Sequence, residues 1–200
     1  MSDFDLGRAV LALARSAIAE RLRLGTLASF QDASLEEPRA SFVTLKLAEQ
    51  LRGCVGSVER RRALRDDVCA NAVAAAFADP RFAPLQAREL AQISIEVSLL
   101  SAEERIEVAS EEELIARLRP GVDGLMLEYG WRRGTLLPQV WRDLQDPRAF
   151  VAAVKLKAGM PEDFWSPGML VSRYAVTTWA EHGIETAGEE HTSPPAAVVL

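Results

Sequence analysis

A regular alternation of apolar and polar residues over residues 93–100 constrains the fold more than any other feature of the sequence. The apolar positions are Ile93, Ile95, Val97 and Leu99, and the polar positions between them are Ser94, Glu96 and Ser98. Successive side chains of a β-strand point to opposite faces, so this alternation predicts a strand with one buried face and one polar face. The chain therefore contains a sheet that is covered on one side.

Two predicted hairpins supply further strands. Three residues, Ala48-Glu49-Gln50, connect the strands of the first hairpin, and Gly130-Trp131 lies at the turn of the second. Short connections of this kind join antiparallel neighbours. The predicted strands are Ser41–Leu47 with Leu51–Val58, Leu125–Tyr129 with Arg132–Leu137, and a final strand over Leu170–Trp179.

Helices are predicted between these strands. They cover residues 4–24, 62–78, 111–118 and 138–144, with one more between Asp146 and Gly159. Asp146-Pro147 is typical of a helix start, with an N-cap followed by proline at the first helical position. Helices and hairpins in this order predict an α+β fold, with a mostly antiparallel sheet flanked by helices. Residues 1–185 are expected to form a single domain, and residues 186–200 a flexible, dispensable tail.

The composition is that of a globular domain with an acidic balance. Of the 200 residues, 48% are hydrophobic and 26% are charged, and the net charge is −6. An acidic chain repels phosphate, so nucleic acid is not an expected partner, and the short basic cluster Glu59–Arg62 is interpreted as a solvated helix start. No apolar run reaches the roughly 18 residues that span a bilayer. The acidic N-terminus is unlike a signal peptide, so we expect a cytoplasmic protein that does not contact a membrane.

Cysteine and histidine are too scarce for the common disulfide and metal frameworks. The two cysteines, Cys54 and Cys69, are not part of a CxxC motif, and the histidines, His182 and His191, lie near the C-terminal end. The sequence therefore predicts neither a metal site nor a cofactor.

The segment Arg52-Gly53-Cys54-Val55-Gly56 is the strongest candidate for chemistry. In a regular strand Arg52 and Cys54 share a face, about 6.6 Å apart. A neighbouring guanidinium favours the thiolate, so the pKa of Cys54 is expected to be lowered. Gly53 and Gly56 indicate a bulge, or a close approach by a ligand or by backbone. The alternative is that Cys54 packs as a small apolar residue while Arg52 forms a salt bridge.

Three further polar residues are candidates for the same site. Asn71 lies within the apolar stripe of the predicted helix 62–78, where a carboxamide must be hydrogen-bonded. It is expected to bind the neighbouring strand, to orient Cys54 or to contact a ligand. Asp79 is expected to cap that helix or to pair with Arg81, and Arg81 alternatively binds an anionic group.

Together these motifs resemble the AMMECR family. Leu51–Gly56 is similar to its LRGCIG signature, with Val55 where isoleucine is commoner and Ala83 where proline is commoner. The resemblance covers roughly residues 5–180. The other matching segments are Asn71-Ala72, Phe77–Pro84, Ile93–Leu100, Pro120–Leu125, Leu136–Trp141, Lys155–Gly159 and the strand with Tyr174.

The resemblance implies a larger and a smaller lobe, with the signature beside a cleft between them. Prokaryotic relatives look like the A component of the AmmeMemoRadiSam system, which implies a Memo-like protein and a radical SAM protein as partners. Two functions are therefore open. In an accessory enzyme, Cys54 is a nucleophile or redox thiol, Arg52 holds the thiolate or a small anionic molecule, Asn71 orients the thiol and Arg81 binds charge. In a binding module, residues 52–56 dock a partner and Cys54 only packs.

Overall fold

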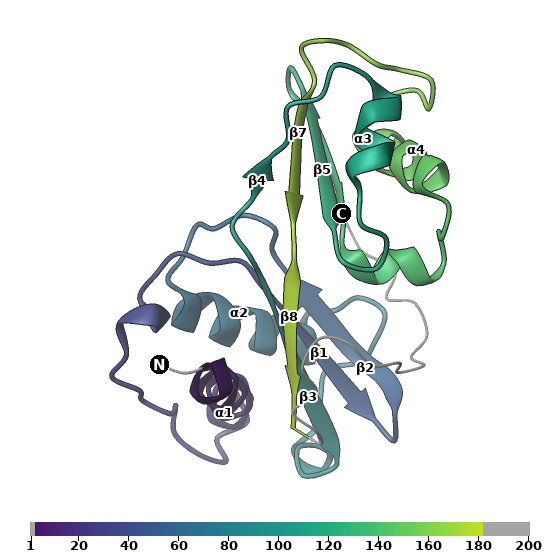
Figure 1. Ribbon diagram of the computed structural model, residues 1–200. Coiled ribbons are helices and arrows are strands. Elements are labelled where there is room, and N and C mark those ends of the chain that lie inside the picture. The colour runs from purple at the N-terminus through teal and green to yellow at the C-terminus, as the bar shows by residue number, and fades with distance from the viewer. Residues whose placement is uncertain (1–2, 182–200) are drawn as a thin grey trace. The chain divides into compact units, whose positions relative to one another are not determined.

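The computed structural model describes residues 3–181, which form two compact units. The first unit comprises the chain up to Leu100 and again from Thr177, and the second comprises Ser101–Val176. The predicted α+β class is confirmed, because each unit combines helices with an antiparallel sheet (Figure 1). The strands form two four-stranded sheets.

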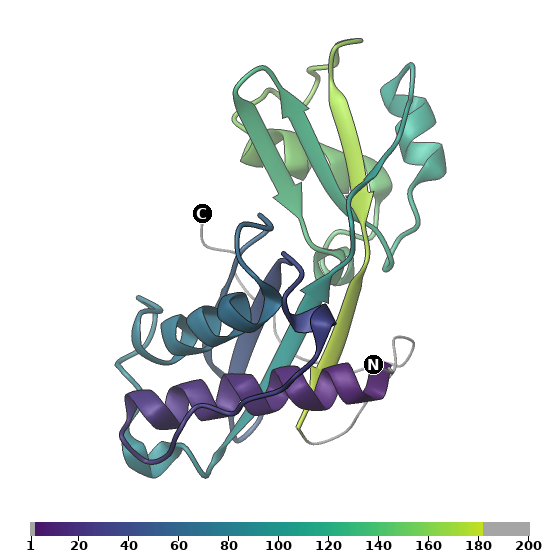
Figure 2. The same ribbon diagram turned by 90° about the vertical axis from the view of Figure 1, so that its left-hand side faces the viewer.

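In the first unit two long helices lie on one side of the sheet. Its elements are α1 (Asp3–Arg21), β1 (Ser41–Leu47), β2 (Gln50–Gly56), α2 (Leu64–Phe77), β3 (Ile93–Leu100) and β8 (Val176–Ala180), with short 3-10 helices η1 (Ala33–Leu35) and η2 (Ala87–Glu89). The strand order is β2-β1-β3-β8. Figure 2 shows α1 and α2 in front of this sheet.

The alternation along β3 decides which face the helices cover. Its four apolar residues at alternate positions are buried against side chains of α1 and α2. Ser94 and Glu96, which point to the other face, are half-buried. The predicted strand with one covered face is therefore confirmed. Within the described residues of this unit, neither helix covers the second face.

The turn of the β1–β2 hairpin consists of two residues, Ala48 and Glu49, whose φ angles are 49° and 63°. Positive φ at both central residues is the type I′ geometry, whose twist matches that of a hairpin. In the ladder that follows, Arg52 faces no residue on β1 and is the extra residue of a bulge. The predicted second strand is therefore interrupted at Arg52, and it ends at Gly56.

The second unit is built on the other sheet. Its elements are β4 (Glu104–Arg105), α3 (Glu111–Arg117), β5 (Gly124–Tyr129), β6 (Arg132–Leu136), η3 (Pro138–Arg142), α4 (Pro147–Lys157) and β7 (Leu170–Tyr174), and the strand order is β4-β7-β5-β6. The predicted helix start is confirmed, because the Asp146 side chain accepts a hydrogen bond from the Arg148 N–H over 3.1 Å. α4 packs so closely on β6 that a Cβ at Gly134 would lie 2.5 Å from the Val154 carbonyl oxygen.

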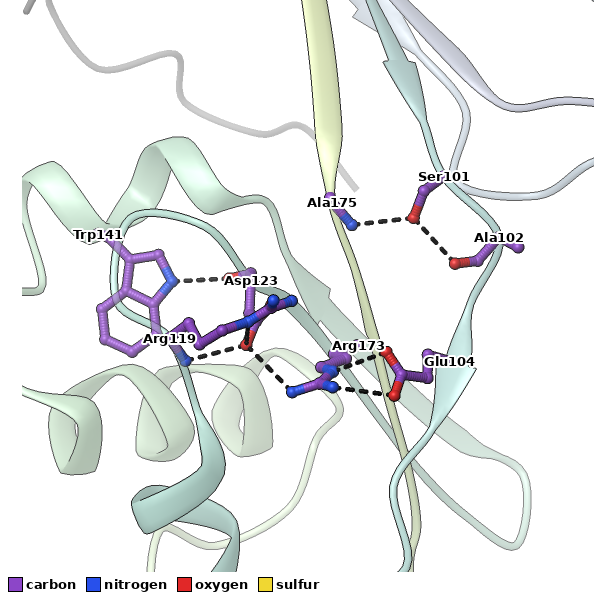
Figure 3. Close-up of polar contacts among 8 residues, drawn as sticks. All are labelled: Ser101, Ala102, Glu104, Arg119, Asp123, Trp141, Arg173 and Ala175. Carbon is purple, nitrogen blue, oxygen red and sulfur yellow. Dashed lines mark hydrogen bonds and ion pairs between the residues drawn. The ribbon is translucent and has the colours of Figure 1, made fainter. Parts of the chain in front are cut away.

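The predicted final strand over residues 170–179 is wrong in one respect. It is two strands, β7 and β8, which belong to different sheets and are separated by Ala175. At this point the Ala175 N–H donates to Ser101 Oγ over 3.0 Å (Figure 3). The Ser101 N–H donates in turn to the Ala175 carbonyl over 2.9 Å. The strand-forming sequence on both sides of Ala175 gives no sign of the division. The two-residue strand β4 was not predicted, because it is too short to show a pattern.

A set of ion pairs fixes the loop before β5 in the second unit. The fully buried Asp123 carboxylate accepts hydrogen bonds from the Arg119 backbone N–H over 2.9 Å and from its guanidinium over 2.6 Å (Figure 3). Trp141 Nε1 donates to the Asp123 carbonyl over 2.7 Å, and Arg173 forms two hydrogen bonds with Glu104, of 2.9 and 3.0 Å. Pairing with arginine explains how a buried aspartate is tolerated here.

Two expectations about the ends of the chain are not tested. The predicted flexible tail over residues 186–200 lies outside the described residues, and a single domain over residues 1–185 stays a prediction. Within residues 3–181, no helix is both long enough and apolar enough to cross a membrane.

Candidate functional site

Cys54 lies on β2, an edge strand of the first sheet, and its side chain points away from α2. Its neighbour Gly53 faces that helix, so alternation places the Cys54 thiol on the opposite face, beside Thr44 of β1. Thr44 Oγ1 donates a hydrogen bond to Cys54 Sγ over 3.3 Å. The thiol is half-buried rather than sealed in the core.

The two glycines of the signature are required by close packing within the protein. A Cβ at Gly53 would lie 2.1 Å from the Ala75 carbonyl oxygen of α2. A Cβ at Gly56 would lie 2.2 Å from the Phe42 ring of β1. Of the predicted reasons for glycine here, close approach by the protein itself accounts for both positions.

Asp79 and Arg81 bind the backbone of Cys54 at the outer edge of β2. Asp79 Oδ2 accepts a hydrogen bond from the Cys54 N–H over 2.9 Å, and Arg81 Nη2 donates to the Cys54 carbonyl over 3.3 Å. The two side chains also pair with each other, with Nη2–Oδ2 and Nε–Oδ1 distances of 2.7 and 2.9 Å. We refer to this pair as the Asp79–Arg81 clip. It satisfies edge groups that would otherwise be open to a further strand.

The environment of the clip shifts the pKa values of Asp79 and of Cys54 in opposite directions. The hydrogen bond from the Arg81 guanidinium lowers the pKa of Asp79 to about 2, against partial desolvation. Burial raises the pKa of the Cys54 thiol, and this effect exceeds the opposing effects of the Thr44 hydroxyl and of Arg81. The expected lowering of the Cys54 pKa is therefore wrong. Desolvation disfavours the thiolate more strongly than the neighbouring cation favours it.

Arg52 is held by an acidic residue outside the signature. Its guanidinium forms two hydrogen bonds with Glu89 of η2, of 2.8 and 3.2 Å, which confirms the salt bridge considered as its alternative role. This contact lowers the pKa of Glu89. The bulge interrupts the alternation between Arg52 and Cys54, so a shared face for the two side chains stays a prediction. Arg52 Nη1 is buried and has no hydrogen-bond partner among the described residues.

Asn71 binds the neighbouring strand, the first of its three predicted roles. Its Nδ2 donates to the Ser41 carbonyl of β1 over 2.9 Å and to Asp67 Oδ2 over 2.9 Å. The Asp67 carboxylate also accepts hydrogen bonds from the Ser41 hydroxyl, over 2.7 Å, and from Arg62, over 2.8 Å. These contacts join α2 to β1, and within residues 3–181 Asn71 makes no hydrogen bond with Cys54. Ser41 and Asp67 were not singled out in the sequence.

A polar surface surrounds the thiol on the face of the sheet that the helices leave uncovered. Thr44 and Glu96 are opposite each other on β1 and β3, and Lys46 Nζ lies 3.2 Å from Glu96 Oε2. We refer to Thr44, Lys46, Cys54 and Glu96, all half-buried, as the polar face. The alternation along β3 predicted a polar side, but not that Lys46 and Cys54 lie on it.

The raised pKa keeps the Cys54 thiol neutral, and Thr44, Lys46 and Glu96 place polar groups around it. The two histidines of the chain, His182 and His191, fall outside the described residues. The predicted residues Gly53, Gly56, Asp79 and Arg81 do lie around Cys54, whereas Asn71 is bound elsewhere. A cleft beside the signature stays a prediction.

Known proteins resemble the chain over most of its length. The family model described as AMMECR1 matches residues 11–179. A protein of Methanothermobacter thermautotrophicus is 39% identical over 184 residues, which are 90% of this chain and 96% of that protein. A protein of Sulfolobus acidocaldarius is 39% identical over 169 residues, 80% of this chain and 74% of that protein. The crystal structure of the uncharacterised protein PH0010 from Pyrococcus horikoshii is similar with a TM-score of 0.74 and 32% identity, covering 89% of this chain and 92% of that one.

Proposed function

The chain belongs to the AMMECR1 family, and we propose that it acts as a non-catalytic binding module that docks a partner protein on the polar face. The observation that carries the proposal is the state of Cys54. Its thiol has a raised pKa, accepts a hydrogen bond from Thr44 and is fixed through its backbone by the Asp79–Arg81 clip. A neutral, immobilised thiol suits a contact surface better than it suits nucleophilic attack.

The arginines expected to bind an anion also support docking. Arg52 is bound by Glu89, and Arg81 by Asp79, in each case through two hydrogen bonds. A small anionic molecule at either guanidinium would compete with these internal carboxylates, and the one Arg52 nitrogen without a hydrogen bond among the described residues, Nη1, is buried. A protein that contacts the polar face meets no such competition.

The polar face has the chemistry of a recognition surface. The pair formed by Lys46 and Glu96 offers one charge of each sign, and Thr44 lies on β1 with Lys46, opposite Glu96 of β3. Arranged charges of this kind select among partners more than they add affinity. The family resemblance suggests a Memo-like protein or a radical SAM protein as the partner. A cytoplasmic location agrees with such a role.

Thiol reactivity distinguishes docking from catalysis. Cys69 should first be changed to alanine, so that Cys54 is the single reporter. We expect iodoacetamide to modify Cys54 in the folded protein at least about 10-fold more slowly than in the urea-unfolded protein at the same pH. A folded-state rate above the unfolded rate would show an activated thiol. It would then favour the second candidate, an accessory enzyme in which Cys54 is the nucleophile or redox thiol.

Charge reversal tests the docking surface. We expect Lys46→Glu to weaken binding to the purified Memo-like or radical SAM protein by at least about 10-fold in isothermal titration calorimetry. Arg117→Glu is the matched control, since Arg117 belongs to an exposed ion pair with Glu113 on α3. Equal binding by both variants, or equal loss in both, would contradict docking through the polar face.

A further inference from the structure

Among residues 3–181, β8 is an edge strand without the usual protection of an edge. Its sequence, Val176-Thr177-Thr178-Trp179-Ala180, contains no charged residue and no proline, and three of its five residues are β-branched. It closes one side of the first sheet, next to β3 (Figure 1). Natural edge strands are commonly blocked by charges, proline or a covering segment, and an uncharged, β-prone edge pairs readily with another strand.

Contacts with β3 show which backbone groups of β8 point outward. The Glu181 N–H donates to the Ile95 carbonyl over 3.1 Å, and the hydroxyls of Ser98 and Thr178 lie 2.9 Å apart. Residues of an antiparallel strand alternately face the neighbouring strand and face away from it. Thr178 and Ala180, three and one positions before Glu181, therefore direct their N–H and C=O groups away from β3, as does Val176.

These outward groups make no hydrogen bond within the described part of the chain. The opposite edge of the same sheet is treated differently, because the Asp79–Arg81 clip occupies both backbone groups of Cys54 on β2. One edge is thus closed by side chains, while the edge at Val176, Thr178 and Ala180 offers three donors and three acceptors in a row.

We infer that β8 pairs with β8 of a second copy of this chain, and that the two first-unit sheets join into one continuous sheet. The outward residues are spaced symmetrically about Thr178, so a two-fold axis there pairs Thr178 with its own counterpart and Val176 with Ala180 of the other copy. Antiparallel pairing in this register matches every outward donor with an acceptor. Threonine opposite threonine is a favourable cross-strand pair, and no charges of like sign meet.

The interface is small, so the dimer forms only at sufficient protein concentration. Pairing over five residues falls at the low end of specific interfaces, for which we expect a dissociation constant of about 10–100 µM. In sedimentation velocity runs from about 1 to about 500 µM, the full chain should convert from monomer to dimer. A monomer throughout this range would overturn the proposal and would favour coverage of β8 by some other segment.

Charge placed on the two-fold axis makes the test specific. Thr178→Lys and Thr178→Glu each set two like charges directly opposite one another in the proposed register, so each variant alone should remain monomeric at about 500 µM. An equimolar mixture of the two should again form dimers. Thr178→Val, which keeps the backbone donor, is the control, and its dimer dissociation constant should lie within about 3-fold of that of the unchanged chain.

Circular dichroism and melting temperature establish that each variant is folded. Undiminished dimers of either charged variant, or no dimers in the mixture, would show that β8 is not the interface.

Discussion

The Asp79 carboxylate accepts a hydrogen bond from the backbone N–H of Cys54, over 2.9 Å, although the two residues lie in separate elements of the first unit. The Asp79 carboxylate, in the loop that follows α2, thus occupies the position that a neighbouring strand would take beside β2. Arg81 completes the substitution by donating to the Cys54 carbonyl. The signature segment is therefore held from outside the sheet by the Asp-Pro-Arg sequence that follows α2.

Asp79→Asn should destabilise the protein in a manner that depends on pH. The pKa of Asp79 is lowered to about 2 in the folded protein, against about 3.9 in an unfolded chain. Because the folded-state pKa is lower, the ionised Asp79 stabilises the fold at pH values above the unfolded-state pKa. This stabilisation is lost as the pH falls through the folded-state pKa. We expect the free energy of unfolding of the variant to be about 2 kcal/mol lower than that of the unchanged protein at pH 7. The difference should shrink between about pH 4 and pH 2.

Urea denaturation at a series of pH values measures this difference. Glu37→Gln is a suitable control, because Glu37 is exposed and belongs to a surface ion pair with Arg39. Its stability difference should stay within about 0.5 kcal/mol across the range. A difference for Asp79→Asn that does not change with pH would show that the charge of Asp79 is not what stabilises the edge of β2.

Gly53→Ala should be strongly destabilising for a steric reason. A methyl group at this position would lie 2.1 Å from the Ala75 carbonyl oxygen, so α2 must move away from β2. We expect a loss of about 3 kcal/mol in the free energy of unfolding. At Gly25 the nearest atom to an added Cβ is 3.6 Å away, and Gly25→Ala should change stability by less than about 0.5 kcal/mol. Similar values for the two variants in chemical denaturation would refute the steric explanation.

The parts of the fold that the sequence predicted well are those fixed by local pattern. The alternation over residues 93–100 gives both the limits and the covered face of β3, because one face of the sheet meets the helices. The division at Ala175 was missed, since membership of one sheet or another depends on partners distant in sequence. A bulge was one of the predicted reasons for Gly53 and Gly56, but its position at Arg52 was not predicted, since an extra residue is defined only against the register of β1.

The sequence predicted which residues belong to the candidate site better than it predicted the contacts between them. Pairing of Asp79 with Arg81 follows from their spacing, and the structure confirms it. Their contacts with the Cys54 backbone join residues 25 and 27 positions apart and have no local signal. The pKa of Cys54 was predicted in the wrong direction, because a nearby arginine can be read from a sequence while the extent of desolvation cannot.

Asn71→Leu should affect stability but not the thiol. Its carboxamide donates to Ser41 and Asp67, and leucine of similar size removes these hydrogen bonds from a buried position. We expect a loss of about 2 kcal/mol in the free energy of unfolding. The alkylation rate of Cys54 in the folded variant should stay within about 3-fold of the unchanged protein, because Asn71 contacts β1 rather than the thiol. A larger change in that rate, with the fold intact, would restore Asn71 to the role of orienting Cys54.

The ion pair of Arg52 with Glu89 should couple β2 to η2. Both side chains are mostly buried, with 14% and 17% exposure, so the pair is less screened than one at the surface. In a double-mutant cycle with Arg52→Ala and Glu89→Ala, we expect a coupling energy of about 1–2 kcal/mol in urea denaturation. The double variant should lose less stability than the sum of the two single losses, because each single variant leaves its partner charge buried and without the ion pair. Binding of the partner protein per folded molecule should persist in Arg52→Ala, since Arg52 is engaged by Glu89 and is not part of the polar face. Loss of binding in Arg52→Ala at full folding, with binding retained in Glu89→Ala, would instead show that the guanidinium itself contacts the partner.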